Sequence, residues 1–240
     1  MAGWHHVRVM RSVLLVCCLL VTSALWGCVA VDSTVIAVLA ADESEQVQQP
    51  LDVEGLEQRV GEICDGCTVE VYDAGSDADT QATQFGEAMV NADMLILDPV
   101  DPEQAESLVE QAGEVPVVAY GTLVPGADWF VGLADAVTPP DDVDSDLEAA
   151  REVISSDRDT FTYVPAAAMS SKAADVAVGE LADEPVGDSV DHEGVPSWLF
   201  EPVGVTVNDL TSVVVASGAM TLAELCSGGT AKRCAKLGLV

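Results

Sequence analysis

The sequence predicts an α/β fold in which a parallel sheet is covered by helices on both faces. Between residues 34 and 137, apolar segments typical of strands alternate with segments that have helical periodicity. The strand segments are short unbroken apolar runs, as expected of strands that are buried on both faces. Because strands that alternate with helices are joined by right-handed crossovers, the alternation indicates a parallel sheet.

The first two strands are each followed by a helix. Thr34 to Ala40 is an unbroken apolar run, and Thr68 to Tyr72 is a short segment rich in β-formers. Two sets of residues then recur at helical spacing: Val53, Leu56, Val60 and Ile63 in the first helix, and Ala78, Ala82, Phe85 and Met89 in the second. This spacing places each set on one face of a helix, where it covers the sheet.

The third helix has the clearest end signals in the chain. Asp101 occupies the N-cap position, Pro102 lies in the first turn, and Gly113 ends the helix. Its apolar stripe consists of Ala105, Leu108, Val109 and Ala112. Three further strands are predicted at Met94 to Leu97, Val115 to Tyr120 and Trp129 to Leu133.

The alternation ends at Thr138-Pro139-Pro140, which is followed by a run of aspartates. We expect an acidic linker there, a helix over 147–154 and an extended segment over 160–164. Pro165 opens a long Ala-rich helix that reaches about Leu181. The tail consists of extended stretches over 195–207 and short helices that end near Leu237.

The N-terminus has the pattern of an export signal. Arg8 and Arg11 precede an apolar run from Val13 to Trp26, which suits a signal peptide better than a spanning helix. The run ends in Leu25-Trp26-Gly27-Cys28, which resembles the lipobox of bacterial lipoproteins. That resemblance implies that Cys28 carries a lipid on the outer face of the cytoplasmic membrane or in the periplasm. The alternative is ordinary signal cleavage nearby, with Cys28 lost or left free.

Four cysteines remain beyond Cys28. An even number in an oxidising compartment suggests two local disulfides, Cys64–Cys67 and Cys226–Cys234. The alternative is a zinc site built on the Cys-x-x-Cys pair. Because the second pair is more widely spaced and no histidine accompanies either, we expect no metal.

The chain is strongly acidic. After Cys28 it carries seven basic residues against 41 acidic ones, a net charge of −34. Such a surface repels nucleic acids and anionic membranes, so we expect membrane contact only through the lipid anchor. An alternative explanation is that the acidic side chains keep the protein hydrated in a high-salt environment. Because 49% of the residues are apolar, the chain can still bury a core.

Ligands of an open parallel sheet bind beyond the carboxyl ends of its strands. At that edge we expect Asp42 after the first strand, Asp98 after the third, and Gly121 and Thr122 after the fourth. Carboxylates and hydroxyls suit a polyol or a sugar. The sequence contains no Gly-x-Ser-x-Gly elbow, phosphate-binding glycine loop or His-based metal motif, so we expect neither an enzyme nor a cofactor.

Four stretches resemble the xylose- and ribose-type sugar-binding proteins that feed ABC importers, which have the type I periplasmic binding fold. The stretches occur in the family's order: residues 92–101 (ADMLILDPVD), 115–120 (VPVVAY), 195–209 and 225–238. The resemblance implies a pentose or hexose as ligand and an importer permease as partner. Members of this family clamp sugar between two lobes, and this chain has no room for most of the second lobe.

The resemblance divides the chain into four parts: a signal peptide with lipobox (1–28), a first α/β lobe (34–137), an acidic linker with a second-lobe remnant (138–163), and a C-terminal helix and tail that pack back on the first lobe (164–240). Asp98 matches a first-lobe sugar contact, Asp144 matches a second-lobe aspartate, and Arg158 falls near a glutamine of the family. Gly121-Thr122 replaces the Asp-Arg pair that grips the sugar in the family.

Without that arginine the bidentate grip of a guanidinium on the sugar is lost. The sequence therefore predicts a solute-binding lipoprotein of sugar import with weakened ligand binding. The alternative is a degenerate, non-binding remnant or a surface interaction lipoprotein of the same fold. The DNA-binding repressors that share these lobes are excluded, because a signal stands in place of a helix-turn-helix and the charge has the wrong sign.

Overall fold

The computed structural model describes residues 33–42, 51–134 and 146–239. In that part of the chain, seven strands form one sheet in the order β2-β1-β3-β4-β5-β8-β7. Its first five strands are β1 (Thr34–Ala40), β2 (Cys67–Asp73), β3 (Met94–Leu97), β4 (Val117–Gly121) and β5 (Trp129–Leu133). These five are parallel to one another, as the sequence predicts.

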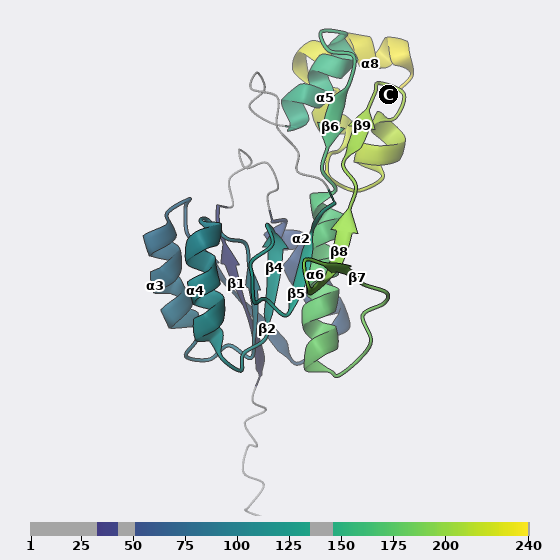
Figure 1. The fold of residues 1–240 in the computed structure, drawn as a ribbon. Helices are drawn as coiled ribbons and strands as arrows, with labels where there is room; N and C mark the ends of the chain where they lie inside the picture. Colours follow the sequence, from purple (N-terminus) through teal and green to yellow (C-terminus); the bar gives the residue numbers. More distant parts are fainter. Residues whose placement is uncertain (1–32, 43–50, 135–145, 240) are drawn as a thin grey trace, which may run out of the picture. The chain divides into compact units, whose positions relative to one another are not determined.

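Helices cover both faces of this sheet (Figure 1). Ile36 and Val38 of β1 contribute to the core on the face of α2 (Val53–Ile63) and α6 (Ala166–Leu181). Ala37 and Leu39 contribute to the core on the opposite face, which carries α3 (Ala78–Ala88) and α4 (Pro102–Ala112). The unbroken apolar runs are explained by this arrangement, because both sides of each inner strand are buried.

Aspartate caps begin α2, α3 and α4. Asp52 accepts a hydrogen bond from the amide of Gly55 at 2.9 Å, and Asp101 accepts from Glu103 at 2.9 Å. Asp77 accepts from Thr80 at 2.6 Å, and this bond lowers the pKa of the Asp77 carboxyl. A cap of this kind is worth about 1 kcal/mol. Part of the acidic composition therefore stabilises helix ends.

Two strands from the tail complete the sheet. β8 (Val195–Phe200) lies parallel to β5, and β7 (Val190–His192) pairs antiparallel with β8 through a tight turn. The sequence predicts an extended tail here but not its place in the sheet. The ring of His192 stacks on that of Phe130, with centroids 5.9 Å apart.

The remaining elements form a separate apolar cluster. It contains α5 (Asp146–Ser155) and a two-stranded antiparallel sheet of β6 (Phe161–Tyr163) and β9 (Val203–Val205). Four short helical segments follow: the π-helix η1 (Thr211–Val215), α7 (Leu222–Leu225), the 3-10 helix η2 (Gly228–Thr230) and α8 (Ala231–Leu237). The predicted second-lobe remnant thus gains partners from the tail.

The division of the chain predicted from the sequence needs one correction. Residues 164–240 were expected to pack back on the first lobe, and α6 and β8 do lie on or in the main sheet. From Val203 onward, however, the chain pairs with β6 and packs on α5. The reason is that Val205, Leu210, Val214 and Leu225 are buried against the apolar faces of α5 and β6, which otherwise lack a core.

Two disulfides join the cysteine pairs expected from the sequence. Cys64 at the end of α2 is bonded to Cys67 at the start of β2, with Cα atoms 5.5 Å apart. Cys226 is bonded to Cys234 of α8, with Cα atoms 5.7 Å apart, inside the small cluster. No helix in the described part of the chain is both long and apolar enough to cross a membrane.

Candidate functional site

The carboxyl ends of β1, β3 and β4 lie side by side at one edge of the main sheet. β3 is the neighbour of both β1 and β4, and all three run in the same direction. Ala41 and Asp42 follow β1, Asp98 follows β3, and Gly121 is the last residue of β4. This is the edge at which parallel sheets bind ligands, and the structure brings the predicted first-lobe residues to it.

Asp98 is the most unusual group at this edge. Its side chain is buried, with the residue 8% exposed, and the amide of Ala41 donates a hydrogen bond to its carboxylate. The other carboxylate oxygen, Oδ2, is buried and has no hydrogen-bond partner in the described part of the chain. Burial raises the pKa of Asp98 to about 7, and the bond from Ala41 only partly opposes this shift.

Hydrogen bonds to neighbouring elements hold the main chain around Asp98. Its own amide donates to the carbonyl of Leu39 at 3.0 Å. The buried side chain of Gln81, on α3, bridges the turn that follows. Its Nε2 donates to the carbonyl of Asp98 at 2.7 Å, and its Oε1 accepts from the amide of Val100 at 3.0 Å. The unpartnered carboxylate oxygen therefore belongs to a well-supported residue.

Asp42 is tied to the loop between β2 and α3. The hydroxyl of Ser76 donates to Oδ2 of Asp42 at 2.7 Å, and the amide of Ser76 donates to the carbonyl of Ala41 at 2.7 Å. The peptide units of Ala41 thus connect the two predicted carboxylates. The amide of Ala41 donates a hydrogen bond to the Asp98 carboxylate. Ser76 donates two hydrogen bonds, one to the carbonyl of Ala41 and one to the side chain of Asp42.

A buried chain of hydroxyls lies on the α2 and α6 face of the same region. Tyr120 of β4 and Ser170 of α6 place their hydroxyl oxygens 3.2 Å apart. Ser170 also accepts a hydrogen bond from the amide of Asp52 at 2.9 Å. Burial raises the pKa of Tyr120 further above its ordinary value, so its hydroxyl stays neutral.

Gly121 ends β4 and forms a tight turn with Thr122. The amide of Thr122 donates to the carbonyl of Tyr120 at 2.7 Å, and Gly121 has a φ of 70°. Because this left-handed conformation favours glycine, the Asp of the family's Asp-Arg pair would be strained here. Thr122 is exposed and supplies a hydroxyl where the resemblance has a guanidinium.

The remaining predicted residues are Arg158, Asp144 and Cys28. Arg158 donates from Nε to Oε2 of Glu152 at 2.9 Å, within the small cluster. Asp144 and Cys28 lie outside the described residues. Ser76, Gln81 and Ser170 were missed, because single polar residues in a loop or a helix leave no signal until the fold places them.

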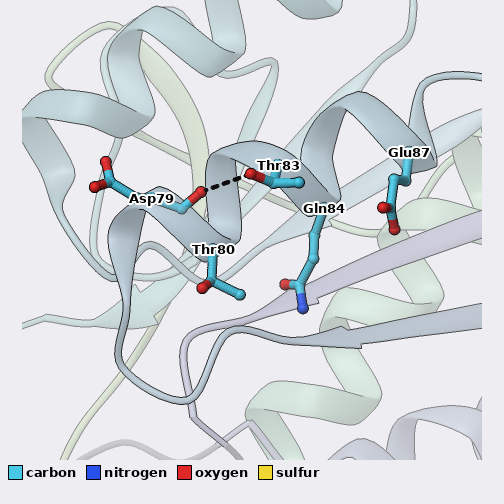
Figure 2. Close-up of a pocket in the computed structure, with 5 residues that line it drawn as sticks. All are labelled: Asp79, Thr80, Thr83, Gln84 and Glu87. Carbon is cyan, nitrogen blue, oxygen red and sulfur yellow. Dashed lines mark hydrogen bonds between the residues drawn. The ribbon is translucent and has the colours of Figure 1, made fainter.

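A hollow on α3 lies apart from these residues. Figure 2 shows that its lining residues belong to one helix. The hydroxyl of Thr83 already donates a hydrogen bond to the carbonyl of Asp79 at 3.0 Å. The hollow is lined by Asp79, Thr80, Thr83, Gln84 and Glu87. A surface hollow that is lined by no aromatic or large apolar side chain suits no ligand closely. Within the described ranges, no three His, Cys, Asp or Glu side chains gather as metal ligands.

No family model and no curated protein sequence matches this chain. Solved structures do match it. An ABC transporter solute-binding protein from Clostridium phytofermentans with bound β-D-glucose aligns at a TM-score of 0.65 and 12% identity, over 80% of this chain and 100% of that one. A carbohydrate transporter solute-binding protein from Chloroflexus aurantiacus in complex with D-glucose aligns at 0.57 and 12%, over 80% and 97%.

A third match is an ABC transporter solute-binding protein from Bacillus halodurans with bound myo-inositol. It aligns at a TM-score of 0.52 and 12% identity, over 75% of this chain and 96% of that one. At this identity the likenesses show the fold alone. The chain has the fold of ABC transporter solute-binding proteins, in a form with a small second cluster, as the resemblance in its sequence predicts.

Proposed function

We propose that this chain is an extracytoplasmic sugar-binding protein of an ABC import system, with weakened affinity for its ligand. The observation that carries the proposal is the buried Asp98 carboxylate, whose Oδ2 has no partner in the described residues. It lies at the carboxyl edge of a sheet whose fold is that of proteins solved with glucose or inositol. A buried acceptor without a partner is unfavourable by about 1–3 kcal/mol, and a ligand hydroxyl would remove that penalty.

The chemistry of the edge favours a neutral polyol over a charged solute. Carboxylates accept hydrogen bonds from sugar hydroxyls, and Asp42 and Asp98 both follow strands at this edge. Two acids would repel an anionic ligand. Thr122 in place of an arginine removes a planar donor pair, which supports the proposal of weak binding. Asp144 and Arg158 stay predictions for the second side of the site.

The location of the protein is also a proposal. The charged and apolar pattern over residues 8–26, followed by Cys28, supports export and a lipid anchor. The fold supports a permease as the partner, because the neighbouring structures are transporter binding proteins.

Calorimetric titration of the purified protein with D-glucose, myo-inositol, D-xylose and D-ribose tests the function. We expect at least one to bind with a Kd of roughly 0.1–1 mM, which corresponds to about −4 to −5.5 kcal/mol. The titration is best made at pH 8, where the Asp98 carboxyl is ionised and its hydrogen bonds are charge-assisted.

Asp98→Asn should abolish this binding, whereas Asp79→Asn, which removes an exposed acid on α3, should leave it unchanged. If none of the four sugars gives a binding signal at 10 mM, the result would favour the non-binding alternative. A Kd below about 1 μM would contradict weakened binding but not the function.

A further inference from the structure

The loop between β2 and α3 has a backbone conformation that its side chains do not favour. Gly75 has a φ of 57°, and Ser76, which follows it, has a φ of 63°. The left-handed region is unfavourable by roughly 1–2 kcal/mol for a residue with a side chain. Glycine would be the natural residue at position 76, so the serine is retained there against the preference of the backbone.

The conformation of this loop is determined by its neighbours. The amide of Ala74 donates to the carbonyl of Ala40 at 3.0 Å, and the amide of Ser76 donates to the carbonyl of Ala41 at 2.7 Å. On its far side the loop passes directly into the Asp77 cap of α3. The loop is thus attached to the end of β1 and to the start of α3, and Ser76 has little freedom to adopt another conformation.

In this position the Ser76 hydroxyl lies against Asp42, donating to its Oδ2 at 2.7 Å. Asp42 follows Ala41, whose amide is bonded to the Asp98 carboxylate. Ser76 and Asp98 therefore fix the same short segment from two sides. A glycine would allow the same turn but would leave the Asp42 carboxylate without this donor.

We propose that Ser76 is a positioning residue of the ligand site, which orients the Asp42 carboxylate toward a sugar hydroxyl beside Asp98. The proposal rests on the proposed function, because it assigns a role within the same site. Ser76 does not need to touch the ligand. It acts through Asp42, and the strained backbone is retained because only a side chain at this position supplies the hydroxyl.

A purely structural role for Ser76 predicts different behaviour. If the serine served only the turn, Ser76→Gly would relieve the backbone strain and leave ligand affinity unchanged. If it positions Asp42, Ser76→Gly should leave the melting temperature unchanged or raised and weaken binding about tenfold, the usual effect of losing one hydrogen bond to a charged group. Ser76→Asn should restore most of the affinity, because asparagine tolerates a positive φ and carries an amide donor.

The experiment is a double-mutant cycle on the full chain, with calorimetric titration by the sugar from the panel above that binds best and a thermal melt of each variant. The cycle compares Ser76→Gly, Asp42→Ala and the double variant with the unaltered protein. The proposal expects Ser76→Gly to weaken binding about tenfold alone and to have no further effect beside Asp42→Ala.

Equal affinity of Ser76→Gly and the unaltered protein would overturn the proposal. So would a tenfold loss that persists beside Asp42→Ala, because Ser76 would then act by a route other than Asp42. Both results leave the sugar-binding function intact. If the unaltered protein binds no sugar of the panel, the proposed function fails, and the role of Ser76 fails with it.

Discussion

The amide of Ala41 donates a hydrogen bond to the carboxylate of Asp98 across the ends of two neighbouring strands. One carboxylate oxygen is thereby satisfied and the other, Oδ2, is buried without a partner in the described residues. Within the described residues, Asp98 forms no ion pair with a basic side chain. Below its raised pKa, protonation neutralises the buried carboxyl in place of a cationic partner. Two of the predictions below follow from the buried polar groups of this region.

The first prediction concerns the dependence of stability on pH. In the unfolded chain Asp98 ionises at its ordinary pKa of 3.8, and in the folded protein at about 7. Between these values the folded state holds a proton that the unfolded state has released. The contribution of this group to stability therefore falls as pH rises from about 4 to about 7 and is constant above that.

Asp98→Asn does not titrate and should lack this fall. At about 1.4 kcal/mol for each pH unit, the variant should gain about 3 kcal/mol on the unaltered protein between pH 5 and pH 8. Urea unfolding of both proteins at the two pH values measures the difference. Asp79→Asn serves as the control for loss of an exposed acid, and parallel pH profiles for Asp98→Asn and the unaltered protein would contradict a raised pKa of Asp98 in the folded state.

The second prediction concerns the hydroxyls of Tyr120 and Ser170. Ser170→Ala removes the acceptor of the Asp52 amide and the partner of the Tyr120 hydroxyl, so it leaves two polar groups to be satisfied elsewhere. Tyr120→Phe removes the hydroxyl bond to Ser170 and the long 3.5 Å bond to the carbonyl of Ala166, while Ser170 keeps the Asp52 amide. We expect Ser170→Ala to lower the free energy of unfolding by about 2–4 kcal/mol and Tyr120→Phe by about 1 kcal/mol. Equal effects in urea unfolding would contradict this order.

The third prediction compares the two disulfides. Cys226–Cys234 spans eight residues and Cys64–Cys67 spans three. Loop closure in the unfolded chain predicts about 2.5 kcal/mol for the longer loop and about 1.6 kcal/mol for the shorter. Cys234 is also buried, so its loss removes packing in the small cluster. In denaturant unfolding, the paired Cys→Ala variant at residues 226 and 234 should therefore lose more free energy of unfolding than the variant at residues 64 and 67. The reverse order would contradict the prediction.

The fourth prediction concerns salt. The chain carries 41 acidic and nine basic residues, and the ion pairs within the described ranges are few. Mutual repulsion of the acids destabilises the compact state, and salt shortens its range from about 10 Å at 0.1 M to about 3 Å at 1 M. The melting temperature should rise by several degrees between these concentrations of NaCl. Variants that replace exposed acids by glutamine should show a smaller rise, and a melting temperature independent of salt would refute the prediction.

Most of the main sheet could be predicted from the sequence, because its signals are local. Asp101 and Gly113 bound α4 where the cap rules place them, and the apolar run of β1 matches the strand. The predicted strand at residue 115 begins two residues later, at Val117, because Pro116 has no amide to donate. The pairing of β8 with β5 and of β9 with β6 depends on residues far apart in the chain, and no local pattern reports it.

The site was predictable only in part for a related reason. Asp42 and Asp98 follow strands, and their place at the sheet edge follows from the fold class. The burial of Asp98, which alters its chemistry, depends on the packing around it and not on its neighbours in sequence. Ser76 lies in a loop, where its left-handed backbone has no sequence signal because serine rarely adopts it.

The small cluster is assembled from two segments that are far apart in the sequence and are therefore synthesised at different times. β6 is complete at Tyr163, but its partner β9 begins at Val203, and α6, β7 and β8 lie between them. During synthesis the N-terminus emerges first, so β1 to β5 can assemble early. The apolar side chains of Phe161 and Tyr163 are covered only after about 40 further residues have been made. Loss of the segment from Val203 onward would leave α5 and β6 exposed to aggregation, so this C-terminal segment protects the part of the chain that is made before it.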